Sequence, residues 1–285
     1  MAKQFILALD AGHYLGTPGK RCMKSLDANE TREWVLNNRV AEAFQERAAE
    51  YEGFVVVRMD DPTGQTETTL QQRVALANAI NADFYLSPHH NAGMNGKRGG
   101  GIVAYCSKGS TKSPAWRDML YDASIAAGGI RGNRTEPKAK ANWYVCVNTN
   151  MPAVLMEYGF MDSPDDVPVI LDPEYSRRMG IAAADAIAKK AELKLKPKAT
   201  TAPVEVPVEE ITFTTLEEIP EAFRRVAAQM IECGAVNGWG DERGLDLTVR
   251  DLRHLAWMIR YVDHAIEMVK AEPAAEIEEQ VVNTG

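Results

Sequence analysis

The chain has 285 residues, of which 45% are hydrophobic and 25% are charged. This composition is typical of a soluble globular protein and argues against a fibrous or largely disordered chain, and the length favours a medium-sized domain with a smaller one. The formal net charge of −8 disfavours nucleic acid and anionic lipid as partners, because the summed field repels phosphate groups.

The N-terminal segment carries five consecutive apolar residues, Phe5–Leu9, before Asp10. This run is shorter than the apolar region of a signal peptide and far shorter than a membrane span. We therefore expect a chain that is made in the cytoplasm, with no signal peptide and no membrane insertion. A substrate in the cell wall would then require a separate route of release.

Short apolar runs alternate with segments of helical periodicity through residues 1–192. The runs predict strands at Phe5–Leu9, Phe54–Met59, Phe84–Leu86, Ile102–Cys106 and Val154–Met156. The periodic segments predict helices at Trp34–Ala49, Leu70–Ile80, Trp116–Ala127 and Tyr175–Ala191. This alternation is typical of an α/β domain in which a mainly parallel, twisted sheet is flanked by helices.

The remainder of the chain divides into three predicted segments. Residues 193–211 lack periodicity and contain three prolines, which predicts an extended linker. Residues 212–270 predict a small, mostly helical domain, with one helix at Pro220–Glu232 and another that begins near Thr248. The tail, residues 271–285, is acidic and is expected to be flexible.

The four cysteines, Cys22, Cys106, Cys146 and Cys233, are scattered along the chain without any CxxC spacing. Such spacing suits neither a disulfide framework nor a cysteine zinc site. We expect free or buried thiols.

Imidazole and carboxylate side chains recur at the carboxyl ends of the predicted strands. His13 comes shortly after the first strand, His89 and His90 follow the third, and Glu157 follows the last. Ligands of open α/β sheets bind at this edge. A single histidine here would more often be an ordinary hydrogen-bonded residue, but two such strand ends with nearby glutamates offer the parts of a catalytic zinc site, which commonly takes two His and one Glu.

Four blocks of residues, in order, carry a resemblance to a known family. The blocks are Asp10–His13, Arg32–Trp34 with Asn37, Ser87–Ala92, and Pro152–Phe160 with Ser163–Asp166 behind it. With these blocks the chain resembles the zinc-dependent N-acetylmuramoyl-L-alanine amidases of the amidase type 3 family, from Lys3 to about Lys190. One block alone would be weak support, whereas four in the family's order and spacing are specific.

The resemblance implies a zinc amidase fold for residues 1–192, peptidoglycan as substrate, and roles for particular residues. His13, Glu33 and His89 would bind Zn²⁺, and Glu157 would act as the general acid/base. Bound zinc would lower the pKa of a water to about 7 and so activate it for attack on the amide between N-acetylmuramic acid and L-alanine. Glu157 would take a proton from that water and return it to the leaving nitrogen.

Two positions in these blocks have competitors. Glu30 and Glu33 lie three residues apart at the start of the first predicted helix, and the family's carboxylate stands four residues before an asparagine. Asn37 therefore favours Glu33, and leaves Glu30 as an exposed or helix-capping carboxylate. His90 adjoins His89, and because neighbouring side chains diverge in extended chain, His90 would face the substrate, support the ligands or be structural.

The resemblance also suggests a biological role. The domain plan fits a phage or prophage endolysin that leaves the cytoplasm through a holin, with residues 212–270 binding a cell-wall ligand or mediating self-association. The alternatives are a bacterial autolysin or sporulation amidase, a zinc peptidase or deacetylase that acts on another amide, and a non-enzymatic wall-binding protein. A purely structural zinc site is disfavoured, because such sites usually have four protein ligands and favour cysteine.

Overall fold

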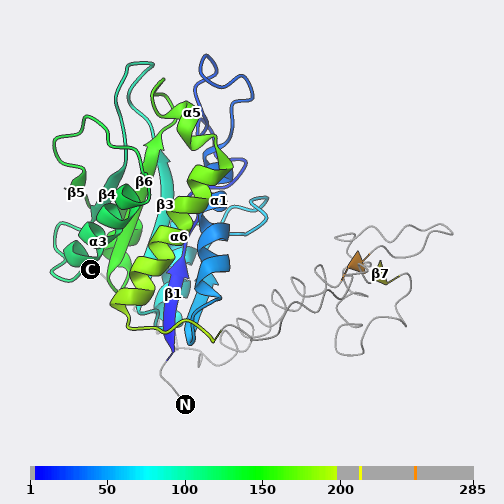
Figure 1. Cartoon of the computed structure of the whole chain (residues 1–285), viewed down its shortest axis with the longest axis vertical. Helices are drawn as coiled ribbons and strands as arrows, with labels where there is room; N and C mark the ends of the chain where they lie inside the picture. Colours follow the sequence, from blue (N-terminus) through cyan, green and yellow to red (C-terminus); the bar gives the residue numbers. More distant parts are fainter. Residues whose placement is uncertain (1–3, 198–211, 214–246, 249–285) are drawn as a thin grey trace, which may run out of the picture. The chain divides into compact units, whose positions relative to one another are not determined.

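The structure is a computed structural model that describes residues 4–197, 212–213 and 247–248 (Figure 1). The chain divides into two compact units, Met1–Lys198 and Ala199–Gly285. In the second unit, strands β7 (Thr212–Phe213) and β8 (Leu247–Thr248) pair antiparallel. Most of the predicted linker, the predicted C-terminal helices and the acidic tail lie outside the described residues.

The first unit alternates strands and helices, as predicted. Its elements are β1 (Phe5–Leu9), α1 (Glu33–Ala48), β2 (Phe54–Arg58), α2 (Leu70–Ala79), β3 (Phe84–Asn91), β4 (Val103–Cys106), α3 (Ser113–Ala126), β5 (Lys138–Lys140), α4 (Tyr144–Asn148), β6 (Ala153–Phe160), α5 (Val167–Ile170) and α6 (Pro173–Lys190). The short elements β5, α4 and α5 were not predicted. Strands β3 and β6 continue beyond their apolar runs, because their backbones keep pairing through polar residues.

The six strands form one sheet in the order β2-β1-β3-β6-β4-β5. Every pair is parallel except β4 with β6, which is antiparallel. The mainly parallel sheet predicted from the sequence is therefore confirmed, with one antiparallel pair. The carboxyl ends of β1, β3 and β6 meet at one edge of the sheet, where the candidate site residues were expected.

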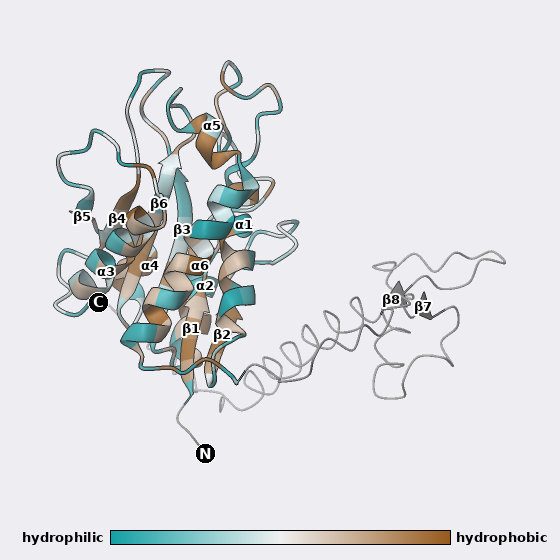
Figure 2. Ribbon diagram, in the orientation of Figure 1, coloured by the Kyte–Doolittle hydropathy of each residue, from teal (hydrophilic) through white to brown (hydrophobic). Residues whose placement is uncertain are grey.

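Helices cover both faces of the sheet, and the side chains of the strands alternate between them. Helices α1, α3 and α6 pack on one face with Val154 and Met156 of β6. Helices α2 and α4 pack on the other face with Leu155. Figure 2 shows hydrophilic and hydrophobic bands alternating along α1 and α6, as expected for helices with one side against a core. Glu157 follows Leu155 by two residues and therefore faces the side of α2 and α4.

Helix α1, which carries Glu33 as its first residue, lies closely against α6. Gly180 of α6 permits this approach, since a Cβ atom there would lie 2.4 Å from the carbonyl oxygen of Val40 and 2.7 Å from the amide nitrogen of Phe44. The close helix pair fixes the start of α1 relative to the sheet.

The first unit continues slightly beyond residue 192, the domain end expected from the composition. The amide of Glu52 donates to the carbonyl of Lys194 at 2.8 Å, and the amide of Lys196 donates to the carbonyl of Glu50 at 2.8 Å. The first residues of the expected linker therefore lie against this unit, because backbone pairing, which composition does not report, holds them there.

Cys22, Cys106 and Cys146 are buried and free, as expected, and Cys233 lies outside the described residues. In the described part of the chain, no helix has the length and apolar character needed to cross a membrane.

Candidate metal and catalytic site

Three of the predicted site residues converge at the carboxyl edge of the sheet. His13 lies in the loop after β1, Glu33 begins α1, and His89 belongs to β3. One nitrogen or carboxylate oxygen of each lies within 4.8 Å of the others. The Oε2 atom of Glu33 is 3.3 Å from Nε2 of His13, and its Oε1 atom is 2.9 Å from Nδ1 of His89. Donor atoms of two imidazoles and one carboxylate thus lie together in one small cluster.

The backbone around His13 is shaped to permit this convergence. His13 has a φ angle of 69°, in the left-handed region that non-glycine residues seldom adopt, and such residues gather at functional sites. Its carbonyl accepts a hydrogen bond from Nη2 of Arg73 at 2.8 Å. The preceding residue must be glycine, because a Cβ atom on Gly12 would lie 2.0 Å from Cε1 of His89. Nδ2 of Asn37 holds the Gly12 carbonyl at 3.0 Å.

Glu33 is almost completely buried, and Glu30 is not part of the group. Burial acts to raise the pKa of the Glu33 carboxyl, but the adjacent imidazoles of His13 and His89 hold it well below its usual range. Glu30 lies in the preceding turn with a φ angle of 48°, and pairs with Arg21 at 3.2 Å. Of the two glutamates that compete in the sequence, the structure brings only Glu33 to the histidines.

His90 points to the opposite side of β3 from His89, as expected for neighbours in a strand. Its Nδ1 atom is 2.8 Å from Oδ1 of Asn37 on α1, and its amide donates to Oε1 of Glu33 at 3.3 Å. Burial lowers the pKa of His90 to about 3, which keeps the imidazole neutral. His90 therefore helps to position Glu33 through its backbone amide and Asn37 through its side chain.

Glu157 lies beside this group on the next strand. It is the register partner of His89 in the β3–β6 pair, so the two side chains share one face of the sheet. Burial, with the negative charge of Glu33, raises the pKa of the Glu157 carboxyl to about 7, although the charge of His89 lowers it. Its Oε2 atom is buried and makes no hydrogen bond to any other described residue. A carboxyl group with such a pKa can accept and donate protons near neutral pH.

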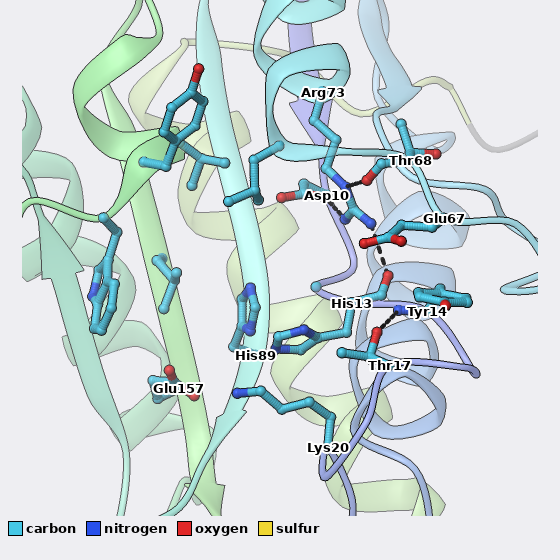
Figure 3. A pocket seen from close by; sticks show the side chains of 16 residues that line it. Asp10, His13, Tyr14, Thr17, Lys20, Glu67, Thr68, Arg73, His89 and Glu157 are labelled. Atoms are coloured by element: carbon cyan, nitrogen blue, oxygen red, sulfur yellow. Dashed lines mark hydrogen bonds and ion pairs between the residues drawn. The ribbon is translucent and has the colours of Figure 1, made fainter.

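A pocket of about 350 Å³ opens over these residues, a size that suits a ligand or part of one. His13, His89 and Glu157 line it, and Figure 3 shows them around its centre. Lys20 also lines the pocket, and its Nζ atom lies 3.7 Å from Oε2 of Glu33. The pocket thus combines the carboxyl of Glu157, two imidazoles of the His13–Glu33–His89 group and the positive charge of Lys20.

The base of the pocket holds a buried ion pair between Asp10 and Arg73. Asp10 also accepts hydrogen bonds from the hydroxyls of Tyr85 at 2.8 Å and Ser87 at 2.9 Å. Burial acts to raise the pKa of Asp10, but Arg73 holds it below its usual value. Because Arg73 also binds the His13 carbonyl, this network joins the start of α2 to the loop that carries His13 (Figure 3).

The part of the chain that carries this site matches a known protein family. Positions 7–189, more than half of the chain, match the family Amidase_3, N-acetylmuramoyl-L-alanine amidase. The chain belongs to this family. Solved structures support the assignment of the fold: the catalytic domain of the amidase CwlV from Bacillus (Paenibacillus) polymyxa var. colistinus aligns with a TM-score of 0.59 at 22% identity, covering 67% of this chain and 100% of that one. An N-acetylmuramoyl-L-alanine amidase from Clostridium difficile 630 aligns with the same TM-score and identity, covering 67% of this chain and 98% of that one.

Curated relatives of this family member include both bacterial and phage proteins. It is 29% identical to the N-acetylmuramoyl-L-alanine amidase CwlM of Bacillus licheniformis over 128 residues, which cover 45% of this chain and 48% of the relative. It is 30% identical to the endolysin of Bacillus phage SPP1 over 130 residues, 45% of this chain and 47% of the relative. The probable cell wall amidase LytH of Staphylococcus aureus is 30% identical over 186 residues, 64% of this chain and 56% of the relative. The chain spans about half the length of the curated relatives it matches.

Sequence reasoning did not single out Arg73 or the position of Lys20 in the pocket. One signal for Arg73 was available, since a lone arginine stands beside Val74 on the buried side of a predicted helix. A buried arginine requires a buried anion, and Asp10 already stood in the first block. Lys20 carries no such signal, because its loop has no periodic pattern.

We expect replacement of Arg73 by methionine to lower the free energy of unfolding of the first unit by about 3–5 kcal/mol, because Asp10 would remain buried without its counter-ion. Urea denaturation measures this. Arg177→Met is the matched control, because Arg177 pairs with Glu174 at the exposed surface and its loss should cost no more than about 1 kcal/mol. Equal unfolding midpoints for the two variants would contradict a structural role for the Asp10–Arg73 pair.

Proposed function

We propose that this chain is a zinc-dependent peptidoglycan amidase that hydrolyses the amide bond between N-acetylmuramic acid and L-alanine. The observation that carries this proposal is the convergence of donor atoms of His13, Glu33 and His89 within 4.8 Å of one another, beside a pocket that His13, His89 and Glu157 line. Membership of the N-acetylmuramoyl-L-alanine amidase family supports the substrate and the bond that is cleaved.

The donor atoms of the group fit zinc. Two imidazole nitrogens and one carboxylate oxygen form a common ligand set of catalytic zinc, in which a fourth position is left for water. The Oε2 atom of Glu33 is buried, makes no hydrogen bond within the described residues, and lies 3.3 Å from Nε2 of His13 and 3.7 Å from Nζ of Lys20, so that a bound cation would give this oxygen a direct partner. When bound, zinc supplies an activated water and polarises the substrate carbonyl. The group contains three residues and no cysteine, which disfavours a purely structural site.

The residues of the chain would divide the remaining work. Glu157 takes a proton from the attacking water on its carboxylate and returns it to the leaving nitrogen of L-alanine, so that no free amide anion forms. His90 and Asn37 hold Glu33 in place from the opposite side of β3. Arg73 fixes the loop of His13. This division assigns proton transfer to Glu157 alone, and metal binding to His13, Glu33 and His89.

Product analysis of digested Gram-positive cell walls tests the proposed reaction. We expect new amino termini of L-alanine to appear in step with the loss of turbidity, without new reducing sugar ends. Amino termini of other residues would indicate a peptidase, and released acetate would indicate a deacetylase. Intact walls to which the protein adheres would indicate a binding protein. Any of these three results would contradict the amidase assignment.

We further propose that the enzyme serves as an endolysin, with residues 212–270 binding the cell wall. Similarity to the endolysin of phage SPP1 supports the first point, whereas similarity to CwlM and LytH favours the alternative of a bacterial wall amidase. Expression in the cytoplasm of a Gram-positive host should leave cells intact until a holin or another agent opens the membrane, after which lysis should be rapid. Lysis without membrane opening would contradict the endolysin role.

The wall-binding role of residues 212–270 is tested by sedimentation with purified walls. The full chain should co-sediment at concentrations at which a chain that ends at Lys198, the limit of the first compact unit, stays in the supernatant. Equal sedimentation of the two chains would contradict wall targeting. A change in the oligomeric state on truncation, with equal wall binding, would instead support self-association.

A further inference from the structure

Large apolar side chains lie exposed around the pocket. Leu70, Trp143 and Tyr144 line it, with exposed fractions of 48%, 46% and 38%. They are three of the five large hydrophobic side chains that are exposed in the described part of the chain. Scattered exposed apolar residues are ordinary, but a group that continues into a pocket marks a surface that a ligand covers.

The register of the strands locates Trp143 within the pocket. Its ring lies edge-to-face against Tyr105, with centroids 5.8 Å apart. Tyr105 on β4 is the register partner of Leu155 on β6, two residues before Glu157. Trp143 therefore lies on the β4 side of Glu157. His89, the register partner of Glu157, lies on the opposite side, towards β1.

The opposite end of the pocket is charged. His13 and Lys20 follow β1, which lies beyond β3 from Glu157 in the sheet order. Figure 3 shows the amine of Lys20 directed towards the space between His89 and Glu157. Glu67 lies on the far side of His13 from Lys20 (Figure 3). Arg73 also lines the pocket but is buried in its ion pair with Asp10, so that Lys20 offers the exposed positive charge. The pocket thus runs from a cation, past the acid/base carboxyl, to an aromatic surface.

The aromatic surface is held rigidly. Helix α4 follows Trp143 directly and buries Val145 and Cys146 against the sheet. The side chain of Asn78 on α2 donates to the carbonyl of Asn148 at 3.1 Å and accepts from the amide of Asn150 at 2.8 Å. A surface that is fixed before a ligand arrives loses little conformational entropy on binding.

We propose that Trp143 and Tyr144 form a saccharide subsite, in which the apolar face of a glycan sugar ring stacks on Trp143 while the peptide stem extends towards Lys20. The proposal rests on the proposed amidase function. Sugar rings of the glycan are uncharged and present C–H groups that pack on aromatic faces, whereas peptide stems carry carboxylates that pair with a lysine amine. When the amide bond to be cleaved lies at Glu157, this orientation places the sugar against the aromatic side chains and the carboxylates of the peptide stem towards the amine of Lys20.

The test compares Trp143→Ala with Trp143→Phe and with Val147→Ala. Val147 is the matched control, because it is 48% exposed on the short helix that follows Trp143 but does not line the pocket. Binding of peptide-free glycan strands is measured by calorimetry, and hydrolysis of whole walls by the release of L-alanine amino termini. We expect Trp143→Ala to weaken glycan binding about tenfold, as the loss of one well-placed aromatic contact would. Trp143→Phe and Val147→Ala should stay within about threefold of the parent.

The kinetic pattern separates a binding role from a structural one. Trp143→Ala should raise KM for walls about tenfold and leave kcat within about twofold, because Trp143 lies away from the reacting atoms. The phenylalanine variant keeps a ring against Tyr105 and covers the case in which the alanine variant is unstable. Unchanged KM and glycan binding in Trp143→Ala would overturn the subsite, as would weaker binding of isolated stem peptides in place of glycan. Glycan binding that depends on Trp143 in a chain that cleaves no wall would support the subsite and overturn the amidase function.

Discussion

Replacement of Glu157 by glutamine is expected to lower kcat for wall hydrolysis by about 100- to 10,000-fold, the range that general acid–base catalysis contributes. Glutamine has the shape of glutamate but can neither take a proton from water nor return it to the leaving nitrogen. The structure supports this role, because Glu157 shares a sheet face with His89 and burial raises its pKa to about 7. Initial rates of L-alanine release at saturating substrate measure the effect.

The zinc content of the Glu157→Gln variant serves as the control. Glu157 is not one of the three clustered donor residues, so the variant should bind zinc as the parent chain does. A variant that is inactive but fully loaded with zinc would separate proton transfer from metal binding. A variant as lytic as the parent would remove Glu157 from the mechanism, and one that had lost zinc would make Glu157 a ligand.

Replacement of Glu33 by alanine is expected to have the second large effect, a loss of zinc affinity of at least about 100-fold. Loss of a group that only orients a ligand costs about 10- to 100-fold in metal affinity, so loss of a ligand should cost no less. Glu33 is buried between His13 and His89, and no other carboxylate joins this group within the described residues. Competition with a chromophoric chelator measures the affinity.

Glu30→Ala is the matched control for Glu33→Ala. Glu30 lies three residues earlier in the same segment and pairs with Arg21 and Lys24 at the surface. We expect the zinc affinity of the Glu30→Ala variant to remain within about threefold of that of the parent chain. Zinc affinity that depended on Glu30 and tolerated Glu33→Ala would contradict the ligand set, and unfolding curves without metal would show whether either variant is disrupted as a whole.

Much of the fold could be predicted from the sequence, because burial leaves a periodic signal. The apolar run Phe5–Leu9 predicts β1 with its observed bounds, and the pattern from Trp34 predicts α1 to within one residue. His13 and Glu157 were recognised because they adjoin such runs and stand in blocks typical of one family. The choice of Glu33 over Glu30 depended on the spacing to Asn37, and the structure brings Glu33 to the histidines.

Other features depend on contacts between distant segments, which leave no local pattern. Strand β3 continues to Asn91 because β6 pairs with its polar end, so His89 lies within the strand and not after it. The antiparallel pairing of β4 with β6 is a property of the sheet order and is not encoded in either strand. Trp143 stands in no periodic pattern or motif, and its place in the pocket follows only from the structure, in which its ring packs against Tyr105.

The most direct test of the account is a zinc titration of the chelator-treated chain, in which bound zinc and the release of L-alanine amino termini from purified walls are measured together. We predict that the metal-free chain releases no L-alanine, and that activity rises in proportion to bound zinc and saturates at about one ion per chain, as one group of three ligands requires. Full activity in the metal-free chain, or one bound zinc without any release of L-alanine, would contradict the assignment of a zinc amidase.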